Sequence, residues 1–322
     1  MSKRGVPDGA KQGAASGDLR ARANKTRVIC LGLSALDQIW RVPELFSGGG
    51  QKIRSLEYDT AGGGMAATAA VAVARLGGIA AFWGRGGDDA AGHEMRKALS
   101  EQGVDVSQFR LFKNGKSSVS GILVDSAGER QIVNFRGQFP EPADWLPLGE
   151  VESASAVLAD PRWLSGAKAL FEAARAKAIP TVLDADVADA QIFETLLPLT
   201  DHAVFSEPAL AGFAGSADDA ALAQVAKFGC RVAAVTRGAN GVSWRANDVV
   251  RHQPAYAVDA IDTTGAGDVF HGAYAFAVGA RLAAEDAMSL AAAAAALKCT
   301  RPGGRAGIPT LEDCLAFQRN GQ

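Results

Sequence analysis

Short runs of hydrophobic residues alternate along the chain with longer stretches that repeat apolar positions at helical spacing. The first run, residues 28–33 (Val-Ile-Cys-Leu-Gly-Leu), is interrupted only by glycine, which is typical of a strand buried on both faces of a parallel sheet. Comparable runs follow at residues 79–84, 157–159, 181–183, 203–205 and 231–235. Because helical stretches lie between most of these runs, the pattern predicts an α/β fold with a doubly wound sheet flanked by helices.

Residues 1 to about 26 differ from the rest of the chain, because they are mainly Gly, Ala, Arg, Lys and Ser with few large apolar side chains. Such a segment cannot bury enough surface to order itself. It also contains no hydrophobic stretch typical of a secretion signal. We expect residues 1–26 to form a disordered tail and residues 27–322 to form one α/β domain.

Composition narrows the possible functions. Of the 322 residues 48% are hydrophobic and 21% are charged, so a large core is available. The formal net charge is −2, which does not indicate the basic surface of a nucleic-acid-binding protein. No apolar run reaches the ~18 residues of a membrane-spanning helix.

The cysteines and histidines show no metal-binding pattern. Cys30, Cys230, Cys299 and Cys314 are scattered along the chain, which indicates free thiols in a reducing compartment, and we expect the cytoplasm. The four histidines have no metal-ligand spacing. His271 lies near the most distinctive motif of the chain, and we interpret it as a helix residue.

That motif spans residues 262–273 and combines glycines, a carboxylate and the start of an apolar helix. The amides of Gly265, Ala266 and Gly267 would lie at the positive end of the helix dipole, which is suited to binding phosphate. Asp268 could then accept the proton of a hydroxyl that attacks a phosphoryl group. An isolated motif of this kind could equally be a glycine-rich helix start whose Asp is only a cap.

The complete string Asp-Thr-Thr-Gly-Ala-Gly-Asp-x-Phe-x-Gly is more specific, and it resembles the C-terminal signature of the PfkB/ribokinase-like carbohydrate kinases. A second family element, Gly-Gly-Gly-Met-Ala-Ala-Thr, is present at residues 62–68 and is followed by an Ala/Val-rich helix. The resemblance extends from about residue 27 to the C-terminus. It implies an ATP-dependent sugar kinase of ribokinase-like fold, with Mg²⁺ as cofactor, Asp268 as general base and the amides of residues 265–267 as anion hole.

The resemblance also explains two segments that do not follow the strand–helix rhythm. Residues from about 38 to 60 and from 109 to 135 contain short, mixed strand-like pieces. They are similar to the small β-sheet lid of this family, which is inserted into the main domain and closes over the substrate. In many relatives the lids also pair between subunits, so that a homodimer through the lid is implied.

On the sugar side, Asp37 follows the first strand, where ligands of doubly wound sheets gather. The resemblance gives Asp37, Gly63 and Gly64 a role in binding the sugar, although a loop Asp that caps a turn would look the same. The chain departs from the family at Met65 and Thr68, where many members carry Asn. These departures weaken any transfer of hydroxyl contacts from ribokinase.

On the nucleotide side, many family members have an Asn-x-x-Glu motif that supports Mg²⁺ and phosphate binding. This chain has Ser206 and Glu207 in that region, and we expect Glu207 to act instead. Thr236, Gly238 and Gly241 match the turn that passes the ATP phosphates. In relatives, loops in the region of residues 301–309 border the adenine and a site for a monovalent cation such as K⁺.

Three strings of the chain also resemble the bacterial sulfofructose kinases, which phosphorylate 6-deoxy-6-sulfofructose at O1. They are Leu-Ala-Asp-x-Arg-Trp at residues 158–163, Phe-Ser-Glu-Pro at 205–208 and the segment 298–309. The resemblance implies Lys52, Asn134 and Arg162 at the sulfonate end of the substrate. A point cation, an amide donor and a guanidinium suit three acceptor oxygens, although Lys52 could also be a solvated lid lysine and Arg162 could belong to a surface salt bridge.

Three further functions remain open from the sequence. The same cations could accept the phosphate of fructose 6-phosphate, and a neutral ketose or ribose would fit if they do not face the site. A catalytically silent sugar-binding regulator on this fold is the alternative from another class. The intact Gly265–Asp268 motif argues against it, and the loss of Asn-x-x-Glu argues weakly for it.

Overall fold

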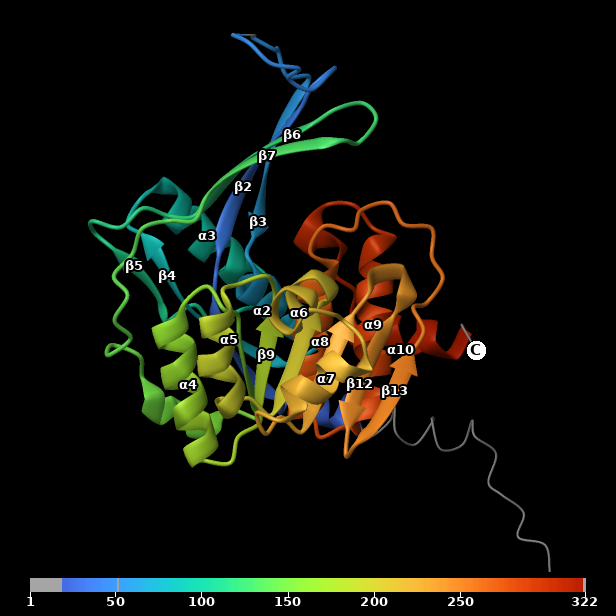
Figure 1. Cartoon of the computed structure of the whole chain (residues 1–322). Helices are drawn as coiled ribbons and strands as arrows, with labels where there is room; N and C mark the ends of the chain where they lie inside the picture. Colours follow the sequence, from blue (N-terminus) through green and yellow to red (C-terminus); the bar gives the residue numbers. More distant parts are fainter. Residues whose placement is uncertain (1–18, 51, 321–322) are drawn as a thin grey trace, which may run out of the picture.

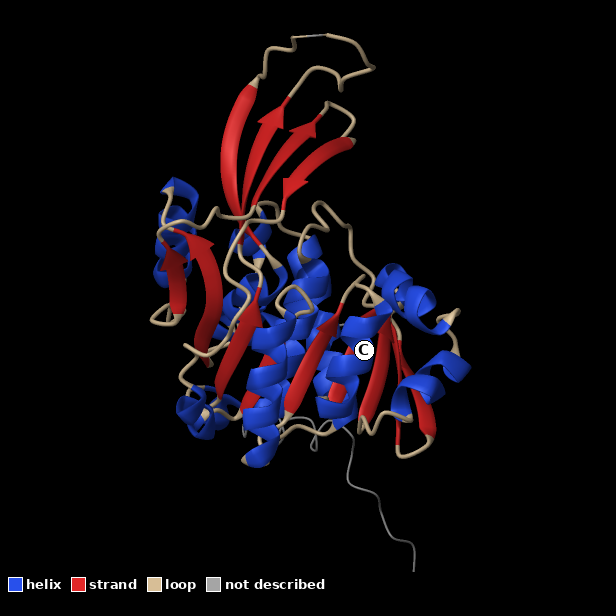
Figure 2. Ribbon diagram, turned by 60° about the vertical axis from the view of Figure 1, so that its left-hand side comes forward, coloured by secondary structure: helices blue, strands red, loops and turns tan. Residues whose placement is uncertain are grey.

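The computed structural model of the chain describes residues 19–50 and 52–320. It consists of a nine-stranded sheet with helices on both faces and a four-stranded sheet that projects from it (Figures 1 and 2). The large sheet has the order β13-β12-β11-β10-β9-β8-β1-β4-β5. Its strands are β1 (Arg27–Gly32), β4 (Ile79–Gly87), β5 (Phe109–Phe112), β8 (Ala156–Ala159), β9 (Thr181–Ala185), β10 (His202–Ser206), β11 (Val232–Thr236), β12 (Val242–Ala246) and β13 (Val249–Gln253).

The helices are α2 (Met65–Arg75), α3 (Ala90–Glu101), α4 (Leu164–Ala176), α5 (Ala190–Leu196), α6 (Glu207–Ala214), α7 (Asp219–Ala226), α8 (Ala266–Gly279), α9 (Ala284–Cys299) and α10 (Leu311–Asn320). Short 3₁₀ turns lie at η1 (Leu148–Ser153), η2 (Leu197–Leu199), η3 (Gly238–Asn240) and η4 (Gly304–Gly307). No helix among residues 19–50 and 52–320 is long and apolar enough to cross a membrane. All four cysteines are free thiols, as the sequence predicts.

The large sheet separates two hydrophobic cores. Val28 and Cys30 of β1 pack into the core beneath α2, α8 and α9, whereas Ile29 and Leu31 pack into the core beneath α4, α5, α6 and α7. Successive side chains of a strand point to opposite faces, so a continuous apolar run fills both cores. β1 pairs in parallel with β4 on one side and with β8 on the other, which confirms the buried parallel strand and the predicted fold class.

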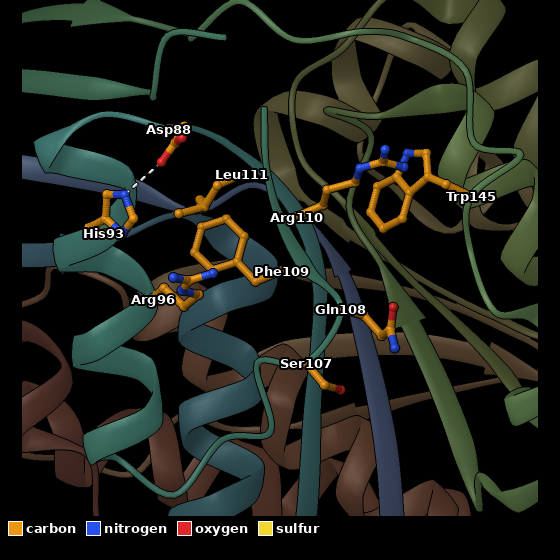
Figure 3. A pocket seen from close by; sticks show the side chains of 9 residues that line it. All are labelled: Asp88, His93, Arg96, Ser107, Gln108, Phe109, Arg110, Leu111 and Trp145. Carbon is orange, nitrogen blue, oxygen red and sulfur yellow. Dashed lines mark hydrogen bonds and ion pairs between the residues drawn. The ribbon is translucent and has the colours of Figure 1, made fainter. Parts of the chain in front are cut away.

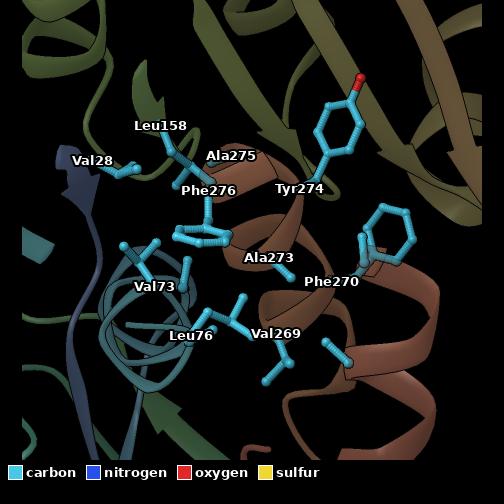
Figure 4. Close-up of a cluster of buried hydrophobic side chains, with 14 of the residues drawn as sticks. Val28, Val73, Leu76, Leu158, Val269, Phe270, Ala273, Tyr274, Ala275 and Phe276 are labelled. Atoms are coloured by element: carbon cyan, nitrogen blue, oxygen red, sulfur yellow. The ribbon is translucent and has the colours of Figure 1, made fainter. Parts of the chain in front are cut away.

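Helix α8 is fixed by close packing against α2 (Figure 4). Phe276 of α8 and Val73 of α2 are completely buried in this contact. At Gly272 a Cβ atom would lie only 2.4 Å from the carbonyl oxygen of Ala69, so glycine is what lets the two helices approach. At the other end, Gly265 lies next to Thr68. The N-terminal turns of α2 and α8 are therefore held side by side.

The four-stranded sheet has the order β3-β2-β6-β7, with β2 (Ala35–Arg41), β3 (Glu57–Gly63), β6 (Val119–Val124) and β7 (Arg130–Phe135). Its presence agrees with the predicted small second sheet. The predicted start of its second segment at residue 109 is wrong, because residues 109–112 form β5 and pair in parallel with β4 of the large sheet. Phe109 explains this, since its ring is buried edge-on against Phe82.

The predicted tail boundary at residue 26 is also too late. Residues 1–18 lie outside the described residues, but residues 19–23 are helical. Leu19 and Ala23 are buried in the α2–α8 core, and Arg20 forms a bidentate ion pair with Glu312 of α10. These contacts, with a hydrogen bond from Arg22 to the carbonyl oxygen of Ala280, attach to the domain a segment whose composition suggests disorder.

Candidate active site

A cleft of about 890 Å³ separates the small sheet from the carboxyl ends of the large sheet. Asp37 and Asn134 line it from the small sheet, whereas Arg162, Asp186 and Asp268 line it from the large sheet and α8. Its size is typical of a small-molecule site, and open α/β sheets bind ligands at this edge. Most of the predicted sugar-side residues thus share one cavity with the predicted base.

The glycine motif forms the first turn of α8. Gly265 is the N-cap residue with φ of 74°, a left-handed conformation that favours glycine. The amide of Ala266 donates to the carbonyl oxygen of Thr263 at 3.2 Å, so one of the three predicted anion-hole donors already has a partner. The following amides lack intrahelical partners because they begin the helix, and they lie at the positive end of its dipole.

Asp268 lies in this same turn and faces the cleft. Burial and the nearby carboxylate of Asp184 raise its pKa to about 7, although His271 and Arg305 oppose the rise. A carboxylate whose pKa lies near the working pH is well suited to accept a proton and to release it again. The electrostatics therefore favour a general base over a simple helix cap.

Asp37, Ser120 and Asn134 form a row across the small sheet. Asp37 of β2 is in register with Ser120 of β6, which is in register with Asn134 of β7. The amide of Asn134 donates to the hydroxyl of Ser120 at 3.1 Å. A Cβ atom at Gly63 would lie 2.5 Å from the carboxylate of Asp37, so glycine there leaves space for the carboxylate. This row presents acceptors and donors that suit sugar hydroxyls.

The turn that leads into α2 depends on Asp160, which the sequence analysis did not assign. This completely buried carboxylate accepts hydrogen bonds from the amides of Leu33 at 2.7 Å, Ala66 at 3.1 Å and Arg162 at 2.9 Å. Gly64 crosses the end of β1 with φ of 95°, and a Cβ atom there would lie 2.5 Å from the carbonyl oxygen of Leu33. An Asp directly after a strand was the available signal.

Arg305 of η4 is a second residue that was not singled out. Its Nε donates to Thr68 Oγ1 at 3.1 Å and its Nη2 donates to the carbonyl oxygen of Gly63 at 2.5 Å. Burial lowers the pKa of Arg305 to about 10, while Asp268 and Asp37 favour its charged form. This buried guanidinium supplies positive charge close to both carboxylates of the cleft.

The predicted sulfonate residues do not all meet. Arg162 lines the cleft, but its guanidinium is bonded to Asp186 at 2.8 Å and to the carbonyl oxygen of Val187 at 2.7 Å. Lys52 is exposed in the connection between β2 and β3 and is not among the residues that line the cleft. Arg136, two residues beyond Asn134, lines the cleft instead. Residues two positions apart in an extended segment point to the same side, so its position two residues after Asn134 could have identified it.

The nucleotide-side residues lie at the adjacent carboxyl ends of β10 and β11. Ser206 and Thr236 are in register. Ser206 caps α6 and donates to Asp186 at 3.2 Å, and Glu207 forms an ion pair with Arg237 at 3.4 Å. These contacts give Ser206 and Glu207 structural roles at the edge where a nucleotide is expected.

The two glycines of this turn differ. A Cβ atom at Gly238 would meet nothing within 4 Å, and its left-handed φ of 52° is what favours glycine there. At Gly241 a Cβ atom would lie 2.1 Å from the carbonyl oxygen of Gln253. Gly241 is thus explained by packing against the end of β13, whereas Gly238 leaves room for a ligand.

The loop before α8 is anchored by a buried lysine. Lys298 of α9, with no solvent exposure, donates to the carbonyl oxygen of Asp262 at 2.7 Å and lies 3.1 Å from its carboxylate. Thr264 and Gly304 donate their amides to the same carboxylate. Although partial burial opposes it, these hydrogen bonds hold the pKa of Asp262 well below its usual range.

A second hollow lies at the outer edge of the large sheet, between β5 and α3 (Figure 3). His93 Nε2 and Asp88 Oδ1 form a hydrogen bond of 2.7 Å at its rim. None of the predicted site residues lines it. The cleft beside Asp268 is therefore the better candidate for the active site.

Comparison with known proteins agrees with this choice. Residues 25–311 match the family model described as pfkB family carbohydrate kinase. The chain is 29% identical over 300 residues to ribokinase from Haemophilus influenzae (89% of this chain, 96% of that protein) and 34% identical over 275 residues to fructokinase from Klebsiella pneumoniae (78% and 90%). It superposes on Arabidopsis thaliana ribokinase, solved with ribose and ATP, with a TM-score of 0.83 at 26% identity, covering 91% of this chain and 98% of that one.

Proposed function

Since the chain belongs to the pfkB family of carbohydrate kinases and is therefore an ATP-dependent sugar kinase, we propose that its substrate is a ketose with an anionic group, most specifically 6-deoxy-6-sulfofructose. The product would be the 1-phosphate. The observation that carries the catalytic part is Asp268, a carboxylate with pKa near 7 at the start of α8 and facing the cleft. The observation that carries the substrate part is that Arg136 and Arg162 line the same cleft as Asn134.

The proposed reaction is an in-line transfer of the γ-phosphoryl group. Asp268 accepts the proton of the attacking sugar hydroxyl, and the free amides at the start of α8 stabilise charge on the transferred group. Asp37 and the neighbouring Ser120 and Asn134 orient the sugar. General-base catalysis alone contributes roughly 10²–10⁴-fold, so positioning and charge stabilisation supply the rest.

The anionic end of the substrate would lie near Asn134, Arg136 and Arg162. Arg162 can exchange Asp186 for a sulfonate because this carboxylate is itself partly exposed, at 39% of its side chain. Arg136 is exposed and lines the cleft. Guanidinium groups bind tetrahedral anions through paired N–H donors. Lys52 remains a candidate from the sequence, and Lys52→Ala tests it beside the two arginines.

The test measures ADP release with 6-deoxy-6-sulfofructose, fructose 6-phosphate and fructose. Wild type, Arg162→Ala, Arg136→Ala and Lys52→Ala are compared side by side. We expect the highest kcat/KM for the sulfonated sugar, with a loss confined to the anionic sugars in the arginine variants. No loss in any of the variants would contradict the anion site, and no sugar-stimulated ADP release at all would favour a silent regulator.

A neutral sugar is the second candidate, and one contact favours it. The guanidinium of Arg162 is already neutralised by Asp186, and the relatives compared above are named ribokinase and fructokinase. If this pair stays closed in the complex, fructose or ribose would be the preferred substrate. In the same assay the wild-type protein would then show its highest kcat/KM with fructose rather than with either anionic sugar.

ATP is expected to bind together with Mg²⁺. A magnesium ion bound with ATP usually takes only one or two protein carboxylates, and Glu207, half exposed at the nucleotide-side edge, fits that requirement. The ion neutralises charge on the β- and γ-phosphates when bound. The monovalent cation that the family resemblance implies is tested by comparing turnover in potassium and choline salts.

The small sheet would also form the dimer contact. Side chains alternate between faces, so Val133 and Phe135 lie on the face opposite Asn134. Tyr58 lies on the same face as Val133, because the register of the sheet runs from Tyr58 through Trp40 and Leu123 to Gln131. These three side chains are exposed, Val133 by 74%, and exposed apolar side chains gathered on one face mark an association site. Sedimentation of wild type and Val133→Glu tests the proposal, which requires that only the variant be monomeric.

A further inference from the structure

His271 is a buried titratable residue that the proposed mechanism does not use. It lies three residues after Asp268 in α8, and only 4% of it is exposed. Its Nδ1 is 2.7 Å from the carbonyl oxygen of Gly267, and its Nε2 is 3.1 Å from the carbonyl oxygen of Val204 in β10. The ring therefore connects the first turn of α8 to the centre of the large sheet.

Both ring nitrogens of His271 thus face atoms that can only accept. A neutral imidazole has one N–H group and could satisfy only one of these oxygens, whereas an imidazolium donates to both. Burial lowers the pKa of His271 below its ordinary value, and the carbonyl oxygens of Val204 and Gly267 and the carboxylates of Asp268 and Asp186 only partly offset this. We assign the imidazolium form from this hydrogen-bond arrangement.

A buried imidazolium needs a counter-charge, and Asp184 of β9 supplies it. Its Oδ1 lies 3.4 Å from Nε2 of His271, and only 2% of the residue is exposed. Its Oδ2 has no hydrogen-bond partner among residues 19–50 and 52–320. Burial and the carboxylates of Asp160 and Asp186 raise the pKa of Asp184. Without a cation beside it, this carboxylate would be costly to keep charged.

We propose that His271 and Asp184 form a buried ion pair that holds the anion-hole turn against the sheet and tunes the basicity of Asp268. The proposal rests on the proposed kinase function, in which Asp268 is the base. His271 and Asp184 do not touch the reacting atoms, so they are positioning residues. The pair is overall neutral. The imidazolium of His271 lowers the pKa of Asp268, whereas the carboxylate of Asp184 raises it.

Several charges act on Asp268 together. Asp184 and Asp160 raise its pKa, whereas His271 and Arg305 lower it. Two other charged groups, Asp186 and Arg162, act on Asp184, and they remain in place when only the pair is changed. Removing the imidazolium should therefore raise the pKa of Asp268, and removing the carboxylate should lower it.

The test is the pH dependence of kcat/KM for the preferred sugar at saturating ATP, from about pH 5.5 to about pH 9, which reports the base in the enzyme–ATP complex before the sugar binds. We expect His271→Gln to move the acidic limb up by roughly 0.5–1 pH unit and Asp184→Asn to move it down by a similar amount, as for a charge removed nearby. The double variant should lie closer to wild type than either single variant.

His202→Gln is the matched control. His202 lies at the same interface of β10 and α8, where its Nδ1 is 2.9 Å from the hydroxyl of Tyr274. We expect this variant to keep the wild-type limb. A merely structural role of His271 and Asp184 would lower turnover without moving the limb in opposite directions. Limbs that coincide with wild type, or that move in the same direction, would overturn the ion pair.

A second readout does not depend on activity or on the variants folding. The chain has four histidines, so ¹⁵N-histidine NMR of the wild-type protein can resolve them. We expect His271 to carry protons on both ring nitrogens at about pH 7.5, above the ordinary histidine pKa; a single protonated nitrogen would overturn the proposal. If no sugar is turned over, the kinase assignment of Asp268 fails, whereas this spectrum still decides the ion pair.

Discussion

Replacing Asp268 by asparagine should separate catalysis from stability. The amide side chain has nearly the same shape but cannot accept the hydroxyl proton as a base. We expect kcat to fall by roughly 10²–10⁴-fold, the usual contribution of general-base catalysis. KM for the sugar should change little, because Asp37 and the row across the small sheet remain. Loss of an interaction made only in the transition state has this signature.

The same substitution should stabilise the protein. The pKa of Asp268 is raised from 3.8 to about 7, so the folded state keeps a proton that the unfolded state releases. The contribution of Asp268 to stability is therefore complete below about pH 4 and is lost as the pH rises toward 7. At about 1.4 kcal/mol per pH unit, this loss reaches as much as about 4 kcal/mol. The Asp268→Asn variant would avoid it, because an amide does not ionise.

The assays are coupled ADP release and urea unfolding at pH values from about 4 to about 8. The stability advantage of Asp268→Asn should be absent at the acidic end and should grow until about pH 7. Asp37→Asn serves as a matched control, because it removes a second carboxylate of the cleft and should raise KM. A variant with near-wild-type turnover would refute the role of Asp268 as base. A constant difference in stability at every pH would refute its raised pKa.

Two further substitutions test the residues that support the cleft. Gly62→Ala would place a Cβ atom 2.2 Å from Nη1 of Arg305. We therefore expect the guanidinium to be displaced and kcat/KM to fall tenfold or more, which corresponds to about 1.4 kcal/mol. Gly149→Ala is the control and should behave as wild type, because a Cβ atom there would meet nothing within 4 Å. Lys298→Met would leave the carboxylate of Asp262 without its buried partner, and urea unfolding should show a loss of roughly 3 kcal/mol, part of which Lys298→Met/Asp262→Asn recovers.

The large sheet could be predicted because most of its strands are short apolar runs that are visible in the local sequence. A continuous apolar run such as residues 28–33 is stable only where both of its faces are buried, as in the middle of a parallel sheet. The structure confirms this position. The boundary of the lid was missed for a physical reason. Residues 109–112 have the same short, mixed pattern as the lid strands, and only the contact of Phe109 with Phe82 decides which sheet they join.

The candidate site could be predicted only in part. Asp37, Asn134, Arg162 and Asp268 line one cleft as expected, because each follows or belongs to a recognisable element. Arg305 was missed because its partner Thr68 is 237 positions away in the chain. No local pattern reports a contact of that range, which depends on how η4 folds back over the end of β3.

The motif 262–268 contains two aspartates whose environments give them different tasks. Asp262 receives the ammonium of Lys298 and the amides of Thr264 and Gly304, so it is a permanent anion that anchors the loop. Asp268 is buried beside other carboxylates, so its charge is costly and its proton is exchangeable near neutral pH. Two similar groups whose environments push their pKa values apart are the general arrangement for acid–base chemistry. Asp262 therefore fixes the loop before α8, and Asp268 acts as base from the first turn of the helix that this loop positions.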